Sequence, residues 1–238
     1  MCDFIFESDD EHIVGKCISN QKYPTVYQKR DNLSVKIDGD VSMVAVVRFA
    51  DSGDVPLEGT AKSLTVDVDE ALLDMMRQLF EKRPVWQRAA LEETVGECAP
   101  AKFTGALRKC SYLFLDGPWR KCYVRFGYDP RKNSEAKIWQ IIDFRDPFLS
   151  DSRLIEDNSV KDVHFRRPPT NRSQLYQLCD IDDLGIQSVL VSSQDHCSAK
   201  SGWLNESQLE SVRNQMKIKS DSMRRQKYFF SVAFFSFI

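Results

Sequence analysis

Residues 69–112 constrain the fold most strongly, because they carry three apolar stripes at helical spacing with a stop signal between the first two. In residues 69–82 the apolar positions follow an i, i+1, i+4, i+5 rhythm, which predicts one buried helical face. These positions are Ala71, Leu72, Met75, Met76, Leu79 and Phe80. Arg83-Pro84 ends this helix, since the residue before a proline avoids helical backbone angles. We predict a second helix from Pro84 or Val85 to Val95 and a third over residues 101–112.

Two strand-like segments follow the helices, at residues 121–126 (KCYVRF) and 137–144 (KIWQIIDF). The connecting residues 127–136 (GYDPRKNSEA) are rich in turn formers, so we predict that the two strands pair as a hairpin. Three helices followed by a β-hairpin wing is the order of a winged helix. The predicted fold class is therefore α+β, with a winged-helix-like domain, flanking strands and a C-terminal helix.

The flanking sequence divides the chain into four predicted parts. Residues 1–53 are a peripheral segment in which 33–37 and 41–49 are typical of a β-hairpin, and residues 54–145 form the winged-helix-like domain. Residues 146–227 are an extension that packs on this domain and ends in a polar helix at 205–226, whose first four residues resemble a capping box. Residues 228–238 are an apolar tail, for which an added strand, a partner-binding segment and the product of an alternative exon or gene-model error are open alternatives.

Shorter elements are predicted within these parts. In the extension we expect a loop at 146–163, a short apolar element at 174–180 and a short helix at 183–191. Residues 51–74 carry seven acidic side chains against one basic side chain, Lys62. Because a helix dipole favours acids in the first turn, we interpret this stretch as a solvated linker plus an acidic helix start. Contact with a basic partner surface is the alternative.

Positive charge is concentrated in the predicted winged helix, although the chain as a whole has a net charge of −2. Eight basic residues and only two acidic residues occur from Lys102 to Lys132. On a helical wheel of about 100° per residue, Lys102, Arg108 and Lys109 point away from the predicted buried side of the third helix. In helix-turn-helix proteins this helix enters the major groove, so its cationic side predicts DNA binding.

The predicted wing adds a second group of cations, with Arg131 and Lys132 at its tip and Lys137 at its base. Cationic contacts to phosphate give affinity without sequence information, whereas arginine also reads guanine edges. An ordinary solvated surface is the alternative for all these bases. The candidate DNA-binding residues are Lys102, Arg108, Lys109, Arg120, Lys121, Arg125, Arg131, Lys132 and Lys137.

Other kinds of site have weak support in the sequence. The seven cysteines form no CxxC pair, which favours reduced thiols in an intracellular protein without metal, and Cys179, His196 and Cys197 lack zinc-site spacing. We expect no enzyme activity and no cofactor, since GxSxG, HExxH and phosphate-loop motifs are missing. No apolar run reaches the roughly 18 residues of a membrane-spanning helix. The aromatic residues of the strand region are spaced for core packing rather than base stacking; they are Trp119, Tyr123, Phe126, Trp139 and Phe144.

Residues 117–145 (GPWRKCYVRFGYDPRKNSEAKIWQIIDFR) resemble the signature of the subunit five family of the RNA polymerase III transcription factor TFIIIC, the DNA-binding subunit of its tau-A lobe. The likeness extends over residues 54–227. It includes DVPL at 54–57, LFEKRPVWQRAAL at 79–91, SQLYQLCDIDD at 173–183 and Gly202-Trp203. A run of this length that contains GPWR, RFGYDPRK and IDFR is a specific signal.

The resemblance implies the C-terminal, DNA-binding half of such a subunit, with a winged helix and a place in the nucleus. It implies that the chain helps TFIIIC to hold the A-box promoter element inside transfer-RNA genes. The implied partners are double-stranded DNA, other TFIIIC subunits, the initiation factor TFIIIB and RNA polymerase III, with no membrane. A winged helix that docks on other TFIIIC or TFIIIB subunits without touching DNA is the alternative.

Three features depart from the family pattern. The chain begins too late to include the family's whole amino-terminal β-barrel, which pairs with a smaller TFIIIC subunit. Residues 145–163 form a short segment, and an aromatic stretch stands where the family commonly has an acidic tail. These departures leave the pairing with the smaller TFIIIC subunit an open question for this chain.

Overall fold

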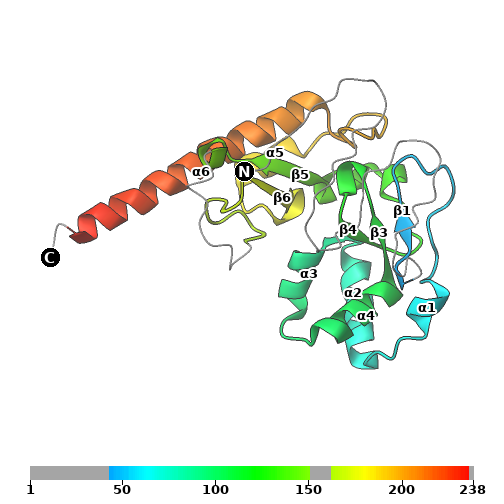
Figure 1. Cartoon of the computed structure of the whole chain (residues 1–238). Helices are drawn as coiled ribbons and strands as arrows, with labels where there is room; N and C mark the ends of the chain where they lie inside the picture. The colour runs from blue at the N-terminus through cyan, green and yellow to red at the C-terminus, as the bar shows by residue number, and fades with distance from the viewer. Residues whose placement is uncertain (1–42, 151–161, 236–238) are drawn as a thin grey trace, which may run out of the picture. The chain divides into compact units, whose positions relative to one another are not determined.

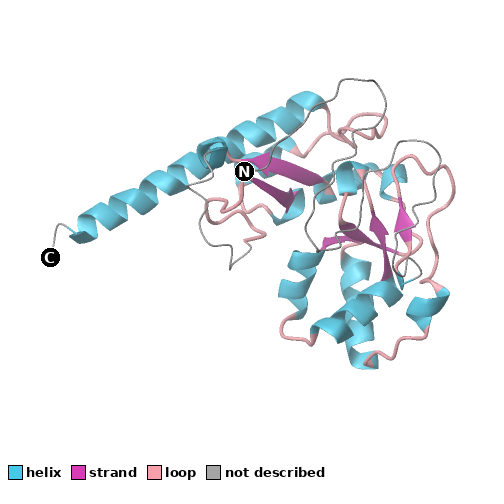
Figure 2. Ribbon diagram, viewed as in Figure 1, coloured by secondary structure: helices cyan, strands magenta, loops and turns pink. Residues whose placement is uncertain are grey.

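The computed structural model describes residues 43–150 and 162–235, so the predicted strand at 33–37 and the turn after it lie outside the described residues. Helices and strands are interspersed along the described chain (Figure 1; Figure 2). One sheet has the strand order β1-β3-β4-β2, and a second sheet pairs β5 with β6. The predicted α+β class with a winged-helix-like domain is confirmed.

Helix α2 (Glu70–Lys82) forms where the sequence predicts it. The Asp69 carboxylate accepts a hydrogen bond from a backbone N–H of the first turn at 2.9 Å, which caps the helix. Arg83 has extended backbone angles and ends it. The buried positions are Leu73, Met76 and Phe80. Met75 was expected on the buried side but is 46% exposed, so the buried stripe is narrower than the predicted one.

The predicted second helix begins later than expected. Val85–Gln87 form strand β2, which pairs antiparallel with β4 (Cys122–Arg125), and only Arg88–Val95 form α3. The side chains of Val85 and Trp86 are of the β-branched and aromatic kinds that favour extended backbone. Pairing with β4 therefore prevails over the helical start that Pro84 suggested.

Helix α4 (Pro100–Cys110) is the third helix, and proline occupies its first turn, where the missing N–H is not needed. It ends two residues earlier than predicted, because Ser111–Phe114 form strand β3. Strand β3 pairs antiparallel with β4 and parallel with β1 (Val46–Val47). Helices α2, α3 and α4 share one apolar core. The order helix, strand, two helices and β-hairpin is that of a winged helix.

The wing of this domain differs from the predicted one. It consists of residues 115–121, between β3 and β4, whereas residues 127–136 do not close a hairpin. Strand β5 (Ile141–Arg145) pairs with β6 (Ser173–Gln177), so the predicted pairing of the segments at 121–126 and 137–144 is wrong. The reason is that β4 is already paired on both sides, with β2 and β3, and offers no free edge to β5.

The β5–β6 ribbon has two covered faces. Its Ile141 side packs in one core with the wing residue Trp119. Its Phe144 side packs against α5 (Leu184–Val189) and α6 (Glu206–Phe235). Because side chains alternate along a strand, one ribbon can join the winged helix to the C-terminal helices.

Helix α6 begins with the predicted capping box. The Asn205 side-chain oxygen accepts from the Gln208 N–H at 2.8 Å, and the Gln208 side-chain oxygen accepts from the Asn205 N–H at 3.0 Å. The helix continues through residues 228–235, so an added strand there is wrong. Of the predicted loop at 146–163, Pro147–Ser150 form a 3₁₀ turn and residues 151–161 lie outside the described residues.

A buried polar joint fixes the ribbon to the winged helix. The Gln177 amide donates to the carbonyls of Val85 at 3.1 Å and Trp139 at 2.9 Å. Its side-chain oxygen accepts from the Gln87 N–H at 2.8 Å. Arg83 forms an ion pair of 2.6 Å with Asp180 beside it. Every polar atom of the buried Gln177 amide is thereby used, which is the condition for burying it without a large penalty.

Candidate nucleic-acid interface

Helices α3 and α4 form the helix-turn-helix, and α4 presents its first turn to solvent. Gly96 ends α3 with φ +80°, a backbone region that glycine enters without a steric penalty. Pro100, Ala101 and Lys102 are all exposed, and Lys102 has no hydrogen bond or ion pair with any described residue. The free N–H groups and the dipole of a first helical turn favour a phosphate. This turn is therefore the part of α4 best placed to meet nucleic acid.

The middle of α4 is covered on its outer side by residues 59–68, which we call the strap and which include α1 (Ala61–Leu64). A methyl group on Gly105 would lie 3.0 Å from the side chain of Val68 and 3.2 Å from that of Val66. Gly105 points roughly away from the buried side of α4, toward the side that a recognition helix turns to the groove. The strap thus restricts access to α4. The acidic side chains of residues 51–74 are exposed, as expected for a solvated stretch, but Val66 and Val68 within it lie against the helix.

The remaining α4 cations are less exposed than predicted. Arg108 and Lys109 are half-buried, and the Nε atom of Arg108 is buried without a hydrogen-bond partner in the described part of the chain. Lys102 and Lys109 are seven residues apart, which puts them on the same side of the helix and about 10 Å apart along its axis. These two lysines share a side of α4, while Arg108 lies about 100° further round it.

The wing is anchored on one side and cationic on the other. The Trp119 ring is fully buried, and its Nε1 donates to the carbonyl of Ala136 at 3.1 Å. Arg120 forms an ion pair of 3.2 Å with Asp143 of strand β5. Lys121 is exposed and has no hydrogen-bonded or ionic side-chain partner among the described residues. The wing therefore holds a fixed position with Lys121 facing solvent.

Arg131 was predicted at an exposed wing tip, and the structure shows that this is wrong. Its side chain is 13% exposed and forms an ion pair of 2.9 Å with Asp129, which is 6% exposed. Its Nη1 also donates to the carbonyls of Arg48 at 3.3 Å and Phe49 at 3.2 Å. Hydrogen bonding to the Asp129 carboxylate raises the pKa of the Arg131 guanidinium. This arginine is occupied in holding residues 48–51 against the 3₁₀ turn Pro130–Lys132.

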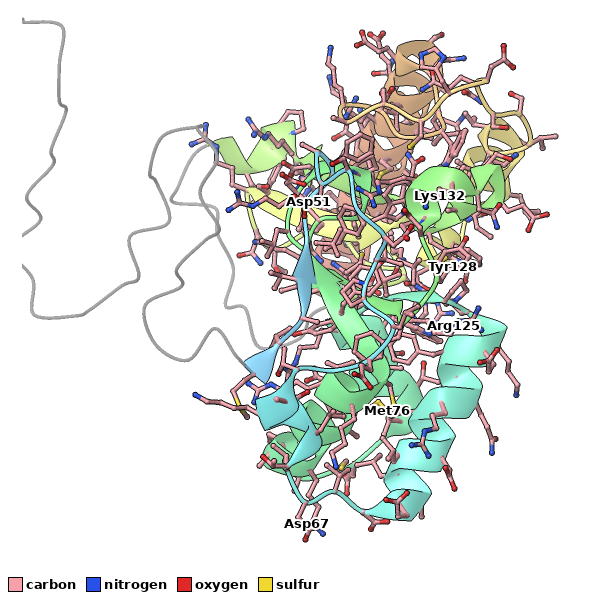
Figure 3. All side chains as sticks on the ribbon, turned by 90° about the vertical axis from the view of Figure 1, so that its right-hand side faces the viewer. Asp51, Asp67, Met76, Arg125, Tyr128 and Lys132 are labelled. Atoms are coloured by element: carbon pink, nitrogen blue, oxygen red, sulfur yellow. The ribbon has the colours of Figure 1, made fainter. Side chains whose placement is uncertain are left out.

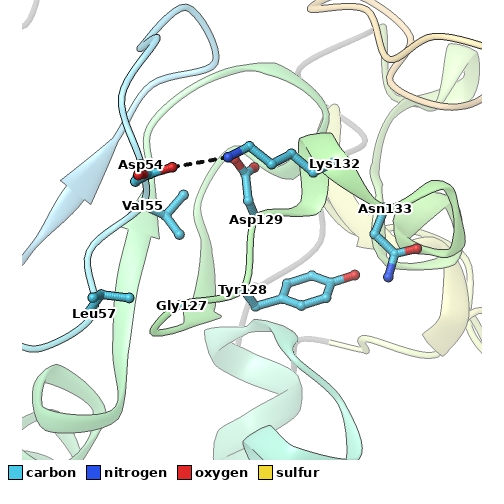
Figure 4. Close-up of a pocket in the computed structure, with 8 residues that line it drawn as sticks. All are labelled: Asp54, Val55, Leu57, Gly127, Tyr128, Asp129, Lys132 and Asn133. Atoms are coloured by element: carbon cyan, nitrogen blue, oxygen red, sulfur yellow. Dashed lines mark hydrogen bonds and ion pairs between the residues drawn. The ribbon is translucent and has the colours of Figure 1, made fainter.

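Three further predicted cations outside α4 also have partners. Lys132 lies 3.2 Å from Asp54 at the edge of a shallow pocket (Figure 4). Lys137 donates to the carbonyl of Val191 at 2.7 Å, and Arg125 forms an ion pair with Glu81. In Figure 3, Lys132 lies well away from Asp67 of the strap, with Tyr128, Arg125 and Met76 between the two in this view. Arg131 and Lys132 therefore do not extend the cationic surface of α4.

The structure assigns the other candidate groups to packing. The aromatic residues Trp119 and Phe144 are buried, and Tyr123, Phe126 and Trp139 pack partly buried against the cores, as predicted. Burial raises the pKa of the Cys110 thiol to about 11, so this thiol is protonated and unreactive at neutral pH. Among residues 43–150 and 162–235, histidine, cysteine and acidic side chains form no group of three that could hold a metal ion. No helix in that part of the chain has the length and apolar character to cross a membrane.

The fold and these contacts define a winged helix-turn-helix domain with cationic side chains on its third helix and its wing. Residues 13–145 match the family described as Tau95, the RNA polymerase III transcription factor (TF)IIIC subunit HTH domain. The match covers more than half of the 238 residues, so the chain belongs to this family of transcription factor subunits. The resemblance seen in residues 117–145 is thereby confirmed.

Several known proteins are similar to this chain. Transcription factor tau subunit sfc1 of Schizosaccharomyces pombe is 34% identical over 152 residues, which are 63% of this chain and 32% of that protein. General transcription factor 3C polypeptide 5 of Homo sapiens is 42% identical over 94 residues, 38% of this chain and 18% of that protein. The solved structure of Sfc1-DBD has a TM-score of 0.59 and 29% identity, and the match covers 76% of this chain and 89% of that one. The chain matches about a third or less of the length of these curated relatives.

Proposed function

We propose that this chain is a DNA-binding part of a TFIIIC subunit and contributes to recognition of the A-box promoter element of transfer-RNA genes. The observation that carries the proposal is the likeness to Sfc1-DBD over 76% of the chain, since that name designates a DNA-binding domain. In this role the chain acts in the nucleus without catalysis and without a cofactor. Its partners are double-stranded DNA and other TFIIIC subunits, and through them TFIIIB and RNA polymerase III.

The first turn of α4 is the groove-facing element in this proposal. Pro100 and Ala101 have small exposed side chains that let the backbone approach the base edges. Lys102 supplies a charge that can bind a phosphate or the guanine acceptors of the major groove. Because the strap covers Gly105, the helix enters the groove by its N-terminal end rather than along its length.

A second candidate function is docking on another TFIIIC or TFIIIB subunit. The observation that favours it is the strap itself, which occupies the outer side of α4 and leaves Leu64 46% exposed. Met75, on α2, is also 46% exposed. An interface of this kind would be anchored by apolar side chains and would be nearly independent of salt.

A salt titration of binding to a transfer-RNA gene fragment separates the two functions. For DNA binding, the logarithm of the affinity falls linearly with the logarithm of the salt concentration, by about 0.9 for each phosphate neutralised. Lys102→Gln is expected to make this slope shallower by about 0.9. Lys217→Gln is the matched control, because Lys217 is also exposed and without a described partner but lies on α6.

Two results would contradict the proposal. One is salt-insensitive or undetectable DNA binding together with retained capture of another TFIIIC subunit, which would establish the docking function instead. The other is an equal change of slope in Lys102→Gln and Lys217→Gln, because it would place the DNA contact outside α4.

A further inference from the structure

We propose that Arg120, Lys121 and Arg145 form a second phosphate-binding site, which we call the ridge, where the wing meets strand β5. The inference rests on the proposed DNA binding and adds a contact to it. Arg145 was not among the cations singled out from the sequence. The ridge would hold the sugar–phosphate backbone of the same duplex that the first turn of α4 enters.

The geometry of the ridge is organised around one carboxylate. The same Asp143 oxygen lies 3.2 Å from the Arg120 guanidinium and 3.8 Å from the Arg145 guanidinium. The Ser173 hydroxyl donates to the other Asp143 oxygen at 2.6 Å. Two guanidinium groups thus share one carboxylate oxygen, and Lys121 follows Arg120 directly in the chain. Among these four residues, three positive charges stand against one negative charge. The wing also carries the exposed Asp116, whose carboxylate accepts from the Phe49 N–H at 2.6 Å.

The two arginines differ in exposure, and we infer different roles for them from that difference. Arg120 is 34% exposed and Asp143 is 25% exposed, so this pair joins the wing to the ribbon. Arg145 is 78% exposed and only loosely placed on Asp143, so most of its N–H donors remain available to a ligand. A planar guanidinium with free donors matches the geometry of a phosphate, to which it can form two parallel hydrogen bonds.

The backbone of the wing adds an independent observation. Lys121 has φ +64°, a left-handed conformation that is uncommon for a residue with a side chain and costs about 1–2 kcal/mol. Its N–H donates to the Phe114 carbonyl at 2.8 Å, which closes the wing with the lysine exposed. Burial of Trp119 holds the other side of the wing in place. The fold therefore keeps a lysine at a strained position where it makes no packing contribution, and such positions concentrate at functional sites.

A polyanion fits this surface better than a protein partner does. Protein interfaces are centred on large apolar or aromatic anchors that become fully buried. The large exposed apolar side chains of the described chain are Leu57, Leu64, Met75, Leu184, Val191 and Ile218, and none belongs to the wing or the ribbon. A surface with net positive charge and no apolar anchor is the kind that binds a phosphate backbone.

The test uses the full chain, a transfer-RNA gene fragment and the salt slope of binding. Arg145→Gln and Lys121→Asn are each expected to make the slope shallower by about 0.9. Asparagine is chosen at position 121 because it tolerates the left-handed backbone, so the charge is removed without added strain. Asp143→Asn removes the competing carboxylate and is expected to change binding in the opposite direction, with a higher affinity for DNA. Lys217→Gln is the control for removal of a charge elsewhere.

The outcomes separate the ridge from the proposed function. If Lys102→Gln changes the slope but Arg145→Gln and Lys121→Asn leave it unchanged, DNA binding stands and the ridge is refuted. If these two variants keep the slope but lose capture of a TFIIIC subunit, the ridge is a protein contact and the proposal is also refuted. If the unmodified chain binds no duplex, both proposals fail together. Thermal unfolding of each variant shows whether it is folded, and an affinity increase in Asp143→Asn could not come from misfolding.

Discussion

Replacing Arg131 by alanine tests whether this arginine serves the fold or the DNA. The side chain makes paired contacts of 2.9 Å to Asp129 through Nε and Nη2. It also reaches the carbonyls of residues 48, 49 and 51, which belong to the segment after β1. All three nitrogens of the guanidinium, Nε, Nη1 and Nη2, thus have acceptors within the described part of the chain. We therefore expect the Arg131→Ala chain to unfold more easily and the proposed DNA binding to stay unchanged.

The size of the loss in stability follows from the carboxylate that the substitution leaves without its counter-charge. Asp129 is 6% exposed, and without the Arg131 side chain its carboxylate stays buried with one backbone N–H, that of residue 131, to bind. Removing one partner of a buried ion pair typically costs about 3–5 kcal/mol, because the other charge is left uncompensated. For a chain of this size, 1 kcal/mol corresponds to about 2–4 °C in Tm, so a fall of roughly 6–20 °C is expected.

The assay is thermal and urea unfolding, with Lys132→Ala as the neighbouring control. Lys132 is 67% exposed and its partner Asp54 is 95% exposed, so this ion pair should contribute less than about 1 kcal/mol. The same two variants are then titrated with salt on a transfer-RNA gene fragment at a temperature where both are folded. An Arg131→Ala protein of normal stability whose salt slope is shallower by about 0.9 would refute the reasoning.

Three further perturbations test the fold that positions the site. Burial raises the pKa of the Cys110 thiol from 9.0 to about 11, so this thiol ionises at lower pH in the unfolded chain than in the folded one. The stability that the protonated thiol contributes to the folded state is therefore complete below pH 9 and is lost as the pH rises toward 11. Cys110→Ala should flatten that part of the plot of urea midpoint against pH. Gly202→Ala should cost about 2–5 kcal/mol in urea unfolding, because Gly202 has φ +65° and an added methyl would lie 2.3 Å from the Gln140 side-chain oxygen. Gly105→Leu should displace the strap at a cost of about 1–3 kcal/mol and expose residues 59–68 to protease, whereas an unchanged cleavage pattern would show that the strap does not depend on this close approach.

The helices of the winged domain could be predicted because their signals are local. The cap at Asp69, the stop at Arg83 and proline in the first turn of α4 all act within a few residues. The capping box at the start of α6 has the same property. A sequence read in short windows contains this information, and the structure confirms these elements within a few residues.

The strand pairing could not be predicted, because it depends on partners distant in the sequence. Strand propensity predicted the segment of β5 but did not indicate that its partner is β6. The first residue of β6, Ser173, pairs with Arg145 of β5. Strands β2 and β3 were missed because each directly adjoins a helix and is only three or four residues long. Once β2 and β3 occupy both edges of β4, the position of the wing follows.

Prediction of the candidate site from the sequence was limited in the same way. The charge run from Lys102 to Lys132 identified the cations but not which of them are neutralised in the fold. For Arg131 the sequence did contain a local signal. Asp129 is two residues away, and the side chains of an Asp-x-Arg pair can form an ion pair with each other within one turn. For Arg120 and Arg125 the partners are 23 and 44 residues away in the sequence, so no local pattern reveals them.

If the proposed function holds, the charges that remain available limit how this domain would hold DNA. Within the described part of the chain, α4 and the ridge together carry five cations with little or no neutralisation; these are Lys102, Arg108, Lys109, Lys121 and Arg145. At about 0.9 per contact, five phosphates correspond to a salt slope near −4.5, about half of the slope near −10 known for a large repressor. Such a domain acts best when tethered, since the effective concentration supplied by a linked partner multiplies a modest affinity. A subunit of a multisubunit transcription factor is tethered in this way. A strap that covers part of the recognition helix is compatible with that role, because the other subunits would hold the domain near its DNA site.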